Sequence, residues 1–358
     1  MPIPIIIGAA ALAAAAYGSK KGYDGYQKKS EANDIIDASK KNYDDQREIF
    51  DIQEKETSRS LESLGKLELE IGDTLNEFKT IADDLLKELN FHSDKNLEIN
   101  ISKNELEKIE NYTYTATAVL ATIAGAGASG AAAGFAVYGG VMALGAASTG
   151  TAISALSGAA ATNATFAAIG GGSLATGGLG IAGGTAILGA AVAAPILAIA
   201  GWAYDKHGED AVNNAKKVRT EINNAIVKLK KAVEQLKEIS KYSTKIERNL
   251  LRIYFEFENY FDELKLIDKK ISDLKGMNIN IEAELDKISE KTIKTIENGY
   301  SLAALIVNLI TTPIFKPKTK DGKVIINEKG PEMELDSEGC LIINSDALDN
   351  ALTNTSKN

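Results

Sequence analysis

The sequence predicts an all-α protein: an elongated antiparallel coiled coil or helical bundle, with a glycine- and alanine-rich hydrophobic helical hairpin block and a small C-terminal β-hairpin. Three observations support this. Apolar residues recur at helical spacing over two long stretches, the 94 residues 111–204 between them carry no charged side chain, and aromatic residues make up 6% of the chain. Charged side chains dominate water-facing surfaces, so this uncharged run must be hidden in a protein interior, an oligomer or a bilayer.

Residues 1–26 form an apolar N-terminal segment, and Lys20, Lys21, Lys28 and Lys29 follow its apolar part with Tyr17, Tyr23 and Tyr26 interleaved. The apolar part reaches Tyr17 and is shorter than the roughly 20 residues that span a bilayer. It lacks the basic start of a secretory signal, so the chain is expected to be made in the cytoplasm without a clear signal peptide. Two interpretations stay open: a tail that dips into a membrane interface beside anionic headgroups, and a helix docked on the core.

Residues 27–110 and 205–299 are expected to form the body, each built on a long helix. In the second, apolar residues repeat over about seven heptads, from Ile222 to Leu274. The two seams are expected to pair antiparallel, which would bring both ends of the uncharged run to one tip. In the first helix the stripe consists of Leu64, Leu67, Ile71, Leu75, Phe78, Ala82, Leu85 and Leu89.

Residues 300–358 differ in kind from the body. The apolar stretch from Leu302 to Ile310 is too short to span a bilayer and predicts a core helix. Two β-branched triplets, 324–326 and 341–343, lie on either side of a Gly-Pro pair and predict a small hairpin. The residues after about 346 are polar and are expected to fray.

The uncharged run holds 19 Gly and 31 Ala. Glycine and polar breaks divide it into candidate membrane spans at about 115–137, 152–169 and 179–200, with a shorter fourth near 139–148. Small residues four apart would let helices approach closely in lipid, and border aromatics would lie at the membrane interface or cap a buried soluble hairpin. The candidate site residues are Gly130, Gly134, Gly140, Gly180, Gly184, Gly189, Tyr112, Tyr114, Trp202 and Tyr204.

No catalytic, cofactor or metal site is predicted, and the sequence does not indicate an enzyme. Two G-x-G-x-x-G matches, 125–130 and 178–183, lack the acidic residue that a dinucleotide site places about 20 positions further on. His92, His207 and Cys340 are the only residues of their types and support neither a zinc site nor a nucleophile triad. A net charge of −9 and a pI near 5.1 argue against nucleic acid as a partner.

Local motifs recur in the run, at Gly158 to Thr165, Gly170 to Ala175 and Gly183 to Thr185, and near the N-terminus, at Pro2 to Pro4 and Lys20 to Asp24. With these motifs the chain resembles a bacterial glycine-zipper family. The resemblance extends in layout over most of the chain and implies no particular activity. The architecture is also similar to α-helical pore-forming toxins and to the apolipoprotein L membrane region, which implies a stored apolar hairpin that inserts to form a pore.

These observations predict a membrane-inserting, oligomerising protein that forms a pore or permeabilises a membrane. In 181–200 the good insertion residues supply only roughly −3 kcal/mol, which favours conditional insertion over a permanent anchor. One alternative is a membrane-associated coiled-coil scaffold that the run anchors without permeabilisation. Another is a soluble protein with a buried Gly/Ala core. The expected partners are a lipid bilayer and either further copies of the chain or a helical partner protein.

Overall fold

The computed structural model describes residues 21–91, 99–123, 132–137, 208–277, 282–320, 323–327, 330–337 and 341–356. These residues are mostly helical, which confirms the all-α class. The contacts divide them into two compact units. The first unit contains residues 21–57 and 208–238, and the second contains the described residues of 58–137 and 239–356.

Two long helices, α1 (Lys21–Phe91) and α7 (Gly208–Gly276), supply residues to both units. Their apolar stripes form because residues three and four apart share one helix face, and that face is buried. All but one of the residues predicted for the first stripe are at most 2% exposed; Leu67 is half-buried, and Leu69 is buried beside it. In the first unit, Thr57 donates a hydrogen bond to the carbonyl of Leu236 at 3.0 Å.

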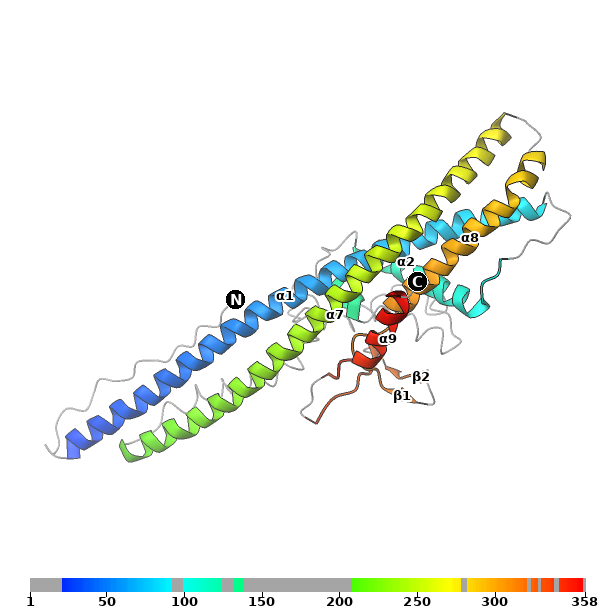
Figure 1. The fold of residues 1–358 in the computed structure, drawn as a ribbon. Helices are drawn as coiled ribbons and strands as arrows, with labels where there is room; N and C mark the ends of the chain where they lie inside the picture. The colour runs from blue at the N-terminus through cyan, green and yellow to red at the C-terminus, as the bar shows by residue number, and fades with distance from the viewer. Residues whose placement is uncertain are drawn as a thin grey trace. The chain divides into compact units, whose positions relative to one another are not determined.

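In the second unit α1 and α7 run parallel, so the predicted antiparallel pairing is wrong. Ser63 of α1 donates to Glu247 of α7 at 2.6 Å, and Glu88 of α1 pairs with Lys275 of α7 at 2.6 Å. Residue numbers therefore rise together along both helices, as their colours in Figure 1 show. An apolar seam has the same spacing in either direction, so it cannot specify orientation. The expectation that both ends of the uncharged run meet at one tip depended on the antiparallel pairing, so it no longer has a basis.

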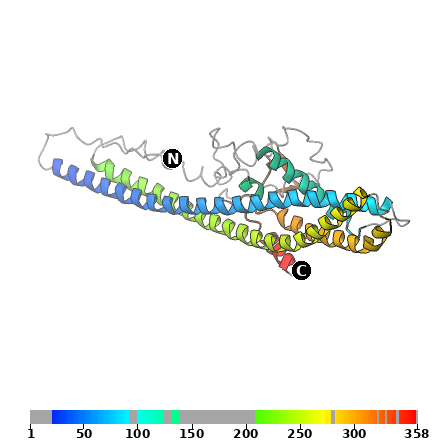
Figure 2. The same ribbon diagram turned by 90° about the horizontal axis from the view of Figure 1, so that it is seen from above.

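Helix α2 (Lys103–Ile123) runs antiparallel to α1 in the second unit. Glu110 of α2 lies 3.7 Å from Lys79, whereas Tyr112, two residues later, bonds to Glu68. Figure 2 shows the teal end of α2 beside α1. Ser102 caps the start of the helix, because its hydroxyl accepts from the amide of Glu105 at 3.3 Å and donates to the Glu105 carboxylate at 2.7 Å.

Helix α8 (Glu282–Ile310) completes a four-helix arrangement in which α1 and α7 run one way and α2 and α8 the other. Lys291 of α8 pairs with Glu263 of α7 at 2.5 Å. The C-terminal half of α8 is the apolar stretch that the sequence predicts to be a core helix, and Ala303, Ile306 and Leu309 are fully buried. That prediction is confirmed, with the refinement that this stretch continues a longer helix.

An aromatic cluster fills the core between α1, α7 and α8. The ring of Phe78 lies 5.1 Å from Phe257, 5.8 Å from Phe261 and 5.0 Å from Tyr300, in edge-to-face geometry. Gly299 faces the same ring, and a β-carbon there would press against it. Edge-to-face pairs add about 0.5 to 1.5 kcal/mol each beyond area burial, so Phe78 is the central packing residue of this unit.

The C-terminal residues form short strands and a helix rather than the predicted single hairpin. β1 (Thr319–Lys320) pairs with β2 (Lys323–Val324), and β3 (Ile326–Asn327) pairs with β4 (Gly330–Pro331), both antiparallel. The two β-branched triplets do not pair with each other within the described strands. Ile343 bridges to Phe315, and Leu341 bridges to Leu335.

Helix α9 (Ser345–Ser356) follows, where the sequence predicts a frayed polar tail. Arg252 of α7 donates to the carbonyl of Thr355, and the hydroxyl of Tyr242 donates to Asp349 at 3.2 Å. Leu348 is fully buried. The tail prediction is therefore wrong for these residues, because one buried apolar face and two anchoring bonds hold a sequence that is otherwise polar.

Candidate functional site

The first part of the uncharged run docks on one face of α1 that carries two glycines. Gly65 and Gly72 are seven residues apart, two helical turns, and therefore lie on the same side of the helix. A β-carbon on Gly65 would overlap the backbone carbonyl of Ala132, and one on Gly72 would overlap the side chain of Ala116. Only glycine permits such a close approach of two backbones. We call Gly65, Glu68 and Gly72 the docking face of α1.

Two segments of the run occupy this face: the uncharged half of α2 and the helical residues 132–137. From α2, Tyr112, Ala116 and Val119 are buried. In the second segment every residue is buried, and Phe135 is fully so. Burying a phenylalanine contributes about 1.5 to 3 kcal/mol, so this docking has a substantial apolar component.

Tyr112 is the main polar link across the docking face. Its hydroxyl donates to the backbone carbonyl of Glu68 at 2.5 Å, and its ring is fully buried. Burial raises the pKa of the Tyr112 phenol well above its usual range, and ionisation of Glu68 would raise it further. Tyr112 therefore remains a neutral hydrogen-bond donor.

Glu68 is a carboxylic acid inside this interface, with 2% of its surface exposed. Burial raises the pKa of its carboxyl well above the usual range, because the charged form would lose its hydration. Among the described residues, its Oε2 atom has no hydrogen-bond partner. A buried acid without a partner is costly when ionised, so the docked form favours the protonated carboxyl.

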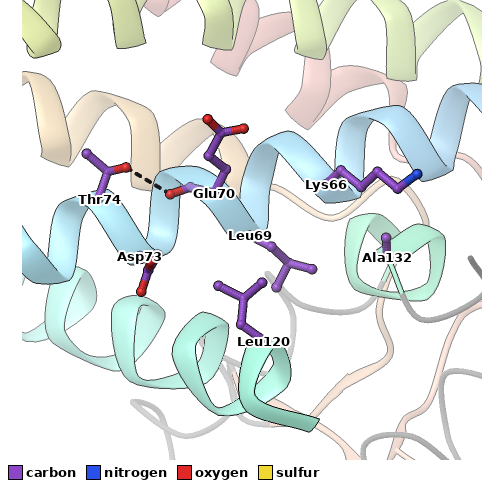
Figure 3. A pocket seen from close by; sticks show the side chains of 7 residues that line it. All are labelled: Lys66, Leu69, Glu70, Asp73, Thr74, Leu120 and Ala132. Atoms are coloured by element: carbon purple, nitrogen blue, oxygen red, sulfur yellow. Dashed lines mark hydrogen bonds between the residues drawn. The ribbon is translucent and has the colours of Figure 1, made fainter. Parts of the chain in front are cut away.

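A shallow pocket of about 320 Å³ opens beside the docking face (Figure 3). Leu69 of α1 and Leu120 of α2 point toward one another at its base, and Ala132 closes one end. On its polar rim, Lys66 pairs with Glu62 at 2.7 Å, and the Thr74 hydroxyl donates to its own helix backbone. The pocket lies at the edge of the interface between α1, α2 and residues 132–137. The lining residues are Lys66, Leu69, Glu70, Asp73, Thr74, Leu120 and Ala132.

Only three of the residues that the sequence singles out lie in the described part of the chain. Tyr112 is fully buried, Tyr114 is 45% exposed, and Gly134 lies in the buried segment 132–137. The structure thus brings Tyr112 into the α1 interface, buries Gly134 in the segment whose Ala132 meets Gly65, and leaves Tyr114 at the surface. The remaining candidates lie outside the described residues: Gly130, Gly140, Gly180, Gly184, Gly189, Trp202 and Tyr204.

The predicted transmembrane helices and pore formation are contradicted. Among the described helices, none has the length and apolar content that a bilayer crossing requires. The candidate span 115–137 overlaps the end of α2 and residues 132–137, and both segments pack on α1. The spans proposed at 139–148, 152–169 and 179–200 lie outside the described residues.

The docking face itself was missed from the sequence. Glycine within a helix ordinarily lowers the stability of that helix, by about 1 kcal/mol relative to alanine. The available signal was the position of the two glycines: Gly65 and Gly72 each follow a buried stripe residue, Leu64 and Ile71. The two glycines therefore share one helix face, where a neighbouring backbone can approach closely.

Comparisons with protein-family models, curated proteins and solved structures find no match for this chain. Across the described residues, no group of three or more His, Cys, Asp or Glu side chains could hold a metal ion. The fold and the docking face together define an all-α protein built around helix–helix contacts.

Replacing Tyr112 by phenylalanine should lower the free energy of unfolding by about 1 kcal/mol, because it removes one buried hydrogen bond and keeps the ring. Urea unfolding monitored by circular dichroism would measure the change. The matched control is Tyr114→Phe, two residues along the same helix and 45% exposed. We expect less than about 0.5 kcal/mol from the control. Equal effects of the two changes would show that the bond to Glu68 contributes nothing.

Proposed function

We propose that the protein is a non-catalytic helical scaffold that associates with a lipid surface through its uncharged run and does not permeabilise the membrane. The observation that carries the proposal is the attachment of the uncharged run to the charged helices. The run of 94 uncharged residues begins inside α2, and its first described residues are fixed to α1. A long charge-free segment thus stays attached to a charged, acidic body.

The body supports a scaffolding role for two reasons. Its apolar stripes extend over many turns of α1 and α7, in the heptad pattern that is typical of a coiled coil. Its buried polar contacts join one helix to another; for example, Ser60 of α1 forms a hydrogen bond with the fully buried hydroxyl of Ser243 of α7. A polar pair within an apolar seam favours one register over others, so it specifies how the two helices align.

The run supports lipid contact by composition. Weak hydrophobicity and many small residues suit a segment that packs against helices or enters the interfacial region of a bilayer. Coiled-coil pairing, lipid contact and association with further copies or a helical partner are all parts of this proposal.

Liposome flotation tests the proposal. The full chain would be compared with a variant in which residues 138–204 are replaced by a Gly/Ser/Glu/Lys linker of equal length, which leaves α2, residues 132–137 and α7 unchanged. Vesicles of phosphatidylcholine alone and with added phosphatidylserine would contain a quenched dye. We expect the full chain to float with the vesicles without dye release, and the linker variant to remain unbound.

Three results would overturn this function. If neither protein floats, the run does not contact lipid, and a soluble protein with a buried Gly/Ala core is the better explanation. If both float equally, a part of the chain other than the run binds the vesicles. Release of dye by the full chain would exclude a scaffold that leaves the membrane intact.

A further inference from the structure

The docking face contains one ionisable group that its packing does not satisfy. Glu68 lies three residues after Gly65 and four before Gly72, so it occupies the helix face that receives α2 and residues 132–137. Its side chain is 2% exposed, and its Oε2 atom has no hydrogen-bond partner among the described residues. A glutamate at the protein surface would be exposed to water, and a buried glutamate with a purely structural role would have a hydrogen-bond partner for this atom.

No described element brings a balancing charge to this carboxyl. From α2 the facing titratable group is the neutral Tyr112 phenol, and residues 132–137 carry no titratable group. On the α7 side, the Glu247 carboxylate accepts a bond from Ser63, five residues before Glu68, and no charged group of the described α7 residues shifts the pKa of Glu68. On α1 itself, the lysine nearest in sequence, Lys66, pairs with Glu62 on the surface. Burial alone accounts for the raised pKa of the Glu68 carboxyl.

We propose that Glu68 is a proton-controlled latch: α2 and residues 132–137 stay docked on α1 while its carboxyl is neutral, and its ionisation releases them. Ionised in place, the carboxylate would lie in an apolar interior with neither water nor a counter-ion. Detachment of α2 offers it water and removes that penalty. Release would also expose the apolar residues that begin the uncharged run, so the latch would control access to that run.

The direction of the pH dependence follows from the raised pKa of Glu68. Below the ordinary glutamate pKa of about 4.3, the carboxyl is protonated in both docked and released forms, and docking has its full stability. Above that value, only the released form ionises readily, so docking weakens as pH rises. The weakening continues until the pH exceeds the raised pKa of the docked form, where it levels off.

Hydrogen exchange followed by mass spectrometry on the full chain tests the latch between pH 5 and 8. Each observed rate would be divided by the intrinsic rate at that pH. In the wild-type protein, we expect protection of peptides from α2 and residues 132–137 to fall by up to about tenfold per pH unit, the linkage for one proton. In Glu68→Gln, which keeps shape and polarity without a titrating proton, protection should not vary with pH.

Glu70→Gln is the matched control, because Glu70 is on the same helix two residues away and exposed. It should keep the wild-type pH slope. Peptides from the C-terminal half of α8 should keep constant protection, which separates local release from global unfolding. A flat wild-type profile, an equal slope in Glu68→Gln, or loss of α8 protection in step with α2 would each overturn the latch. No lipid is present, so this test is independent of the proposed membrane association.

Discussion

Replacing Phe78 by alanine should lower the free energy of unfolding by about 3 to 5 kcal/mol, the usual cost of removing a buried aromatic ring from a core. Phe78 is 1% exposed and contacts rings from α7 and α8. Its loss removes three edge-to-face contacts at once and leaves a cavity that the rigid helices cannot readily fill. Chemical denaturation, with the midpoint and slope measured separately, would report the change.

The control for this prediction is Phe255→Ala. Phe255 is a phenylalanine on α7, in the same unit, but it is 67% exposed. Its removal should change stability by less than about 0.5 kcal/mol, as is usual for surface substitutions. If both changes cost the same, the aromatic cluster would not be the packing centre that its geometry indicates.

Gly65→Ala should destabilise the protein by about 2 to 3 kcal/mol and expose residues 132–137 to hydrogen exchange. Two effects oppose each other. Alanine gains about 1 kcal/mol of helix propensity over glycine. The new β-carbon, however, overlaps the backbone carbonyl of Ala132, which no rotamer change can move aside. Undocking of this segment also exposes Phe135, so the steric effect exceeds the gain.

Gly276→Ala separates the gain in helix propensity from the steric overlap of the new β-carbon. Gly276 ends α7, and a β-carbon built there meets nothing within 4 Å. The same substitution should therefore be neutral or stabilise by up to about 1 kcal/mol. A stabilising Gly65→Ala, with unchanged protection of residues 132–137, would show that this segment does not dock on α1.

The helices themselves were predictable because periodicity is a local property. The stripe from Leu64 to Leu89 identified the buried face of α1, and the spacing through Phe257 did the same for α7. The small errors have a physical cause: a strict heptad drifts around a straight helix. Steps of three and four residues from Phe257 reach Tyr260, which is half-buried, whereas Phe261 beside it is buried.

The parallel orientation of α1 and α7, and the docking of α2 and residues 132–137 on α1, could not be predicted from periodicity. The seams of α1 and α7 look alike in either direction, and their parallel arrangement depends on where the intervening chain returns. In sequence Glu68 resembles any exposed helix charge, because the segments that dock on its helix face come much later: Tyr112 and Ala132 are 44 and 64 positions further on. Of the candidate site residues, Tyr112 and Gly134 are buried, Tyr114 is exposed, and the others lie outside the described residues. The membrane and helix-packing roles assigned to them stay predictions.

The parallel pairing of α1 and α7 also determines the order in which partners become available during synthesis. Ser63 and Glu247 are 184 residues apart, whereas Glu68 and Tyr112 are 44 apart. A ribosome adding about 5 to 20 residues per second needs roughly 10 to 40 s to cover the longer separation. During that interval the apolar stripe of α1 has no α7 to cover it, and α2 is the first helix that can bind. Close packing at Gly65 and Gly72 thus gives the nascent chain an early, short-range contact before its long-range seam can form.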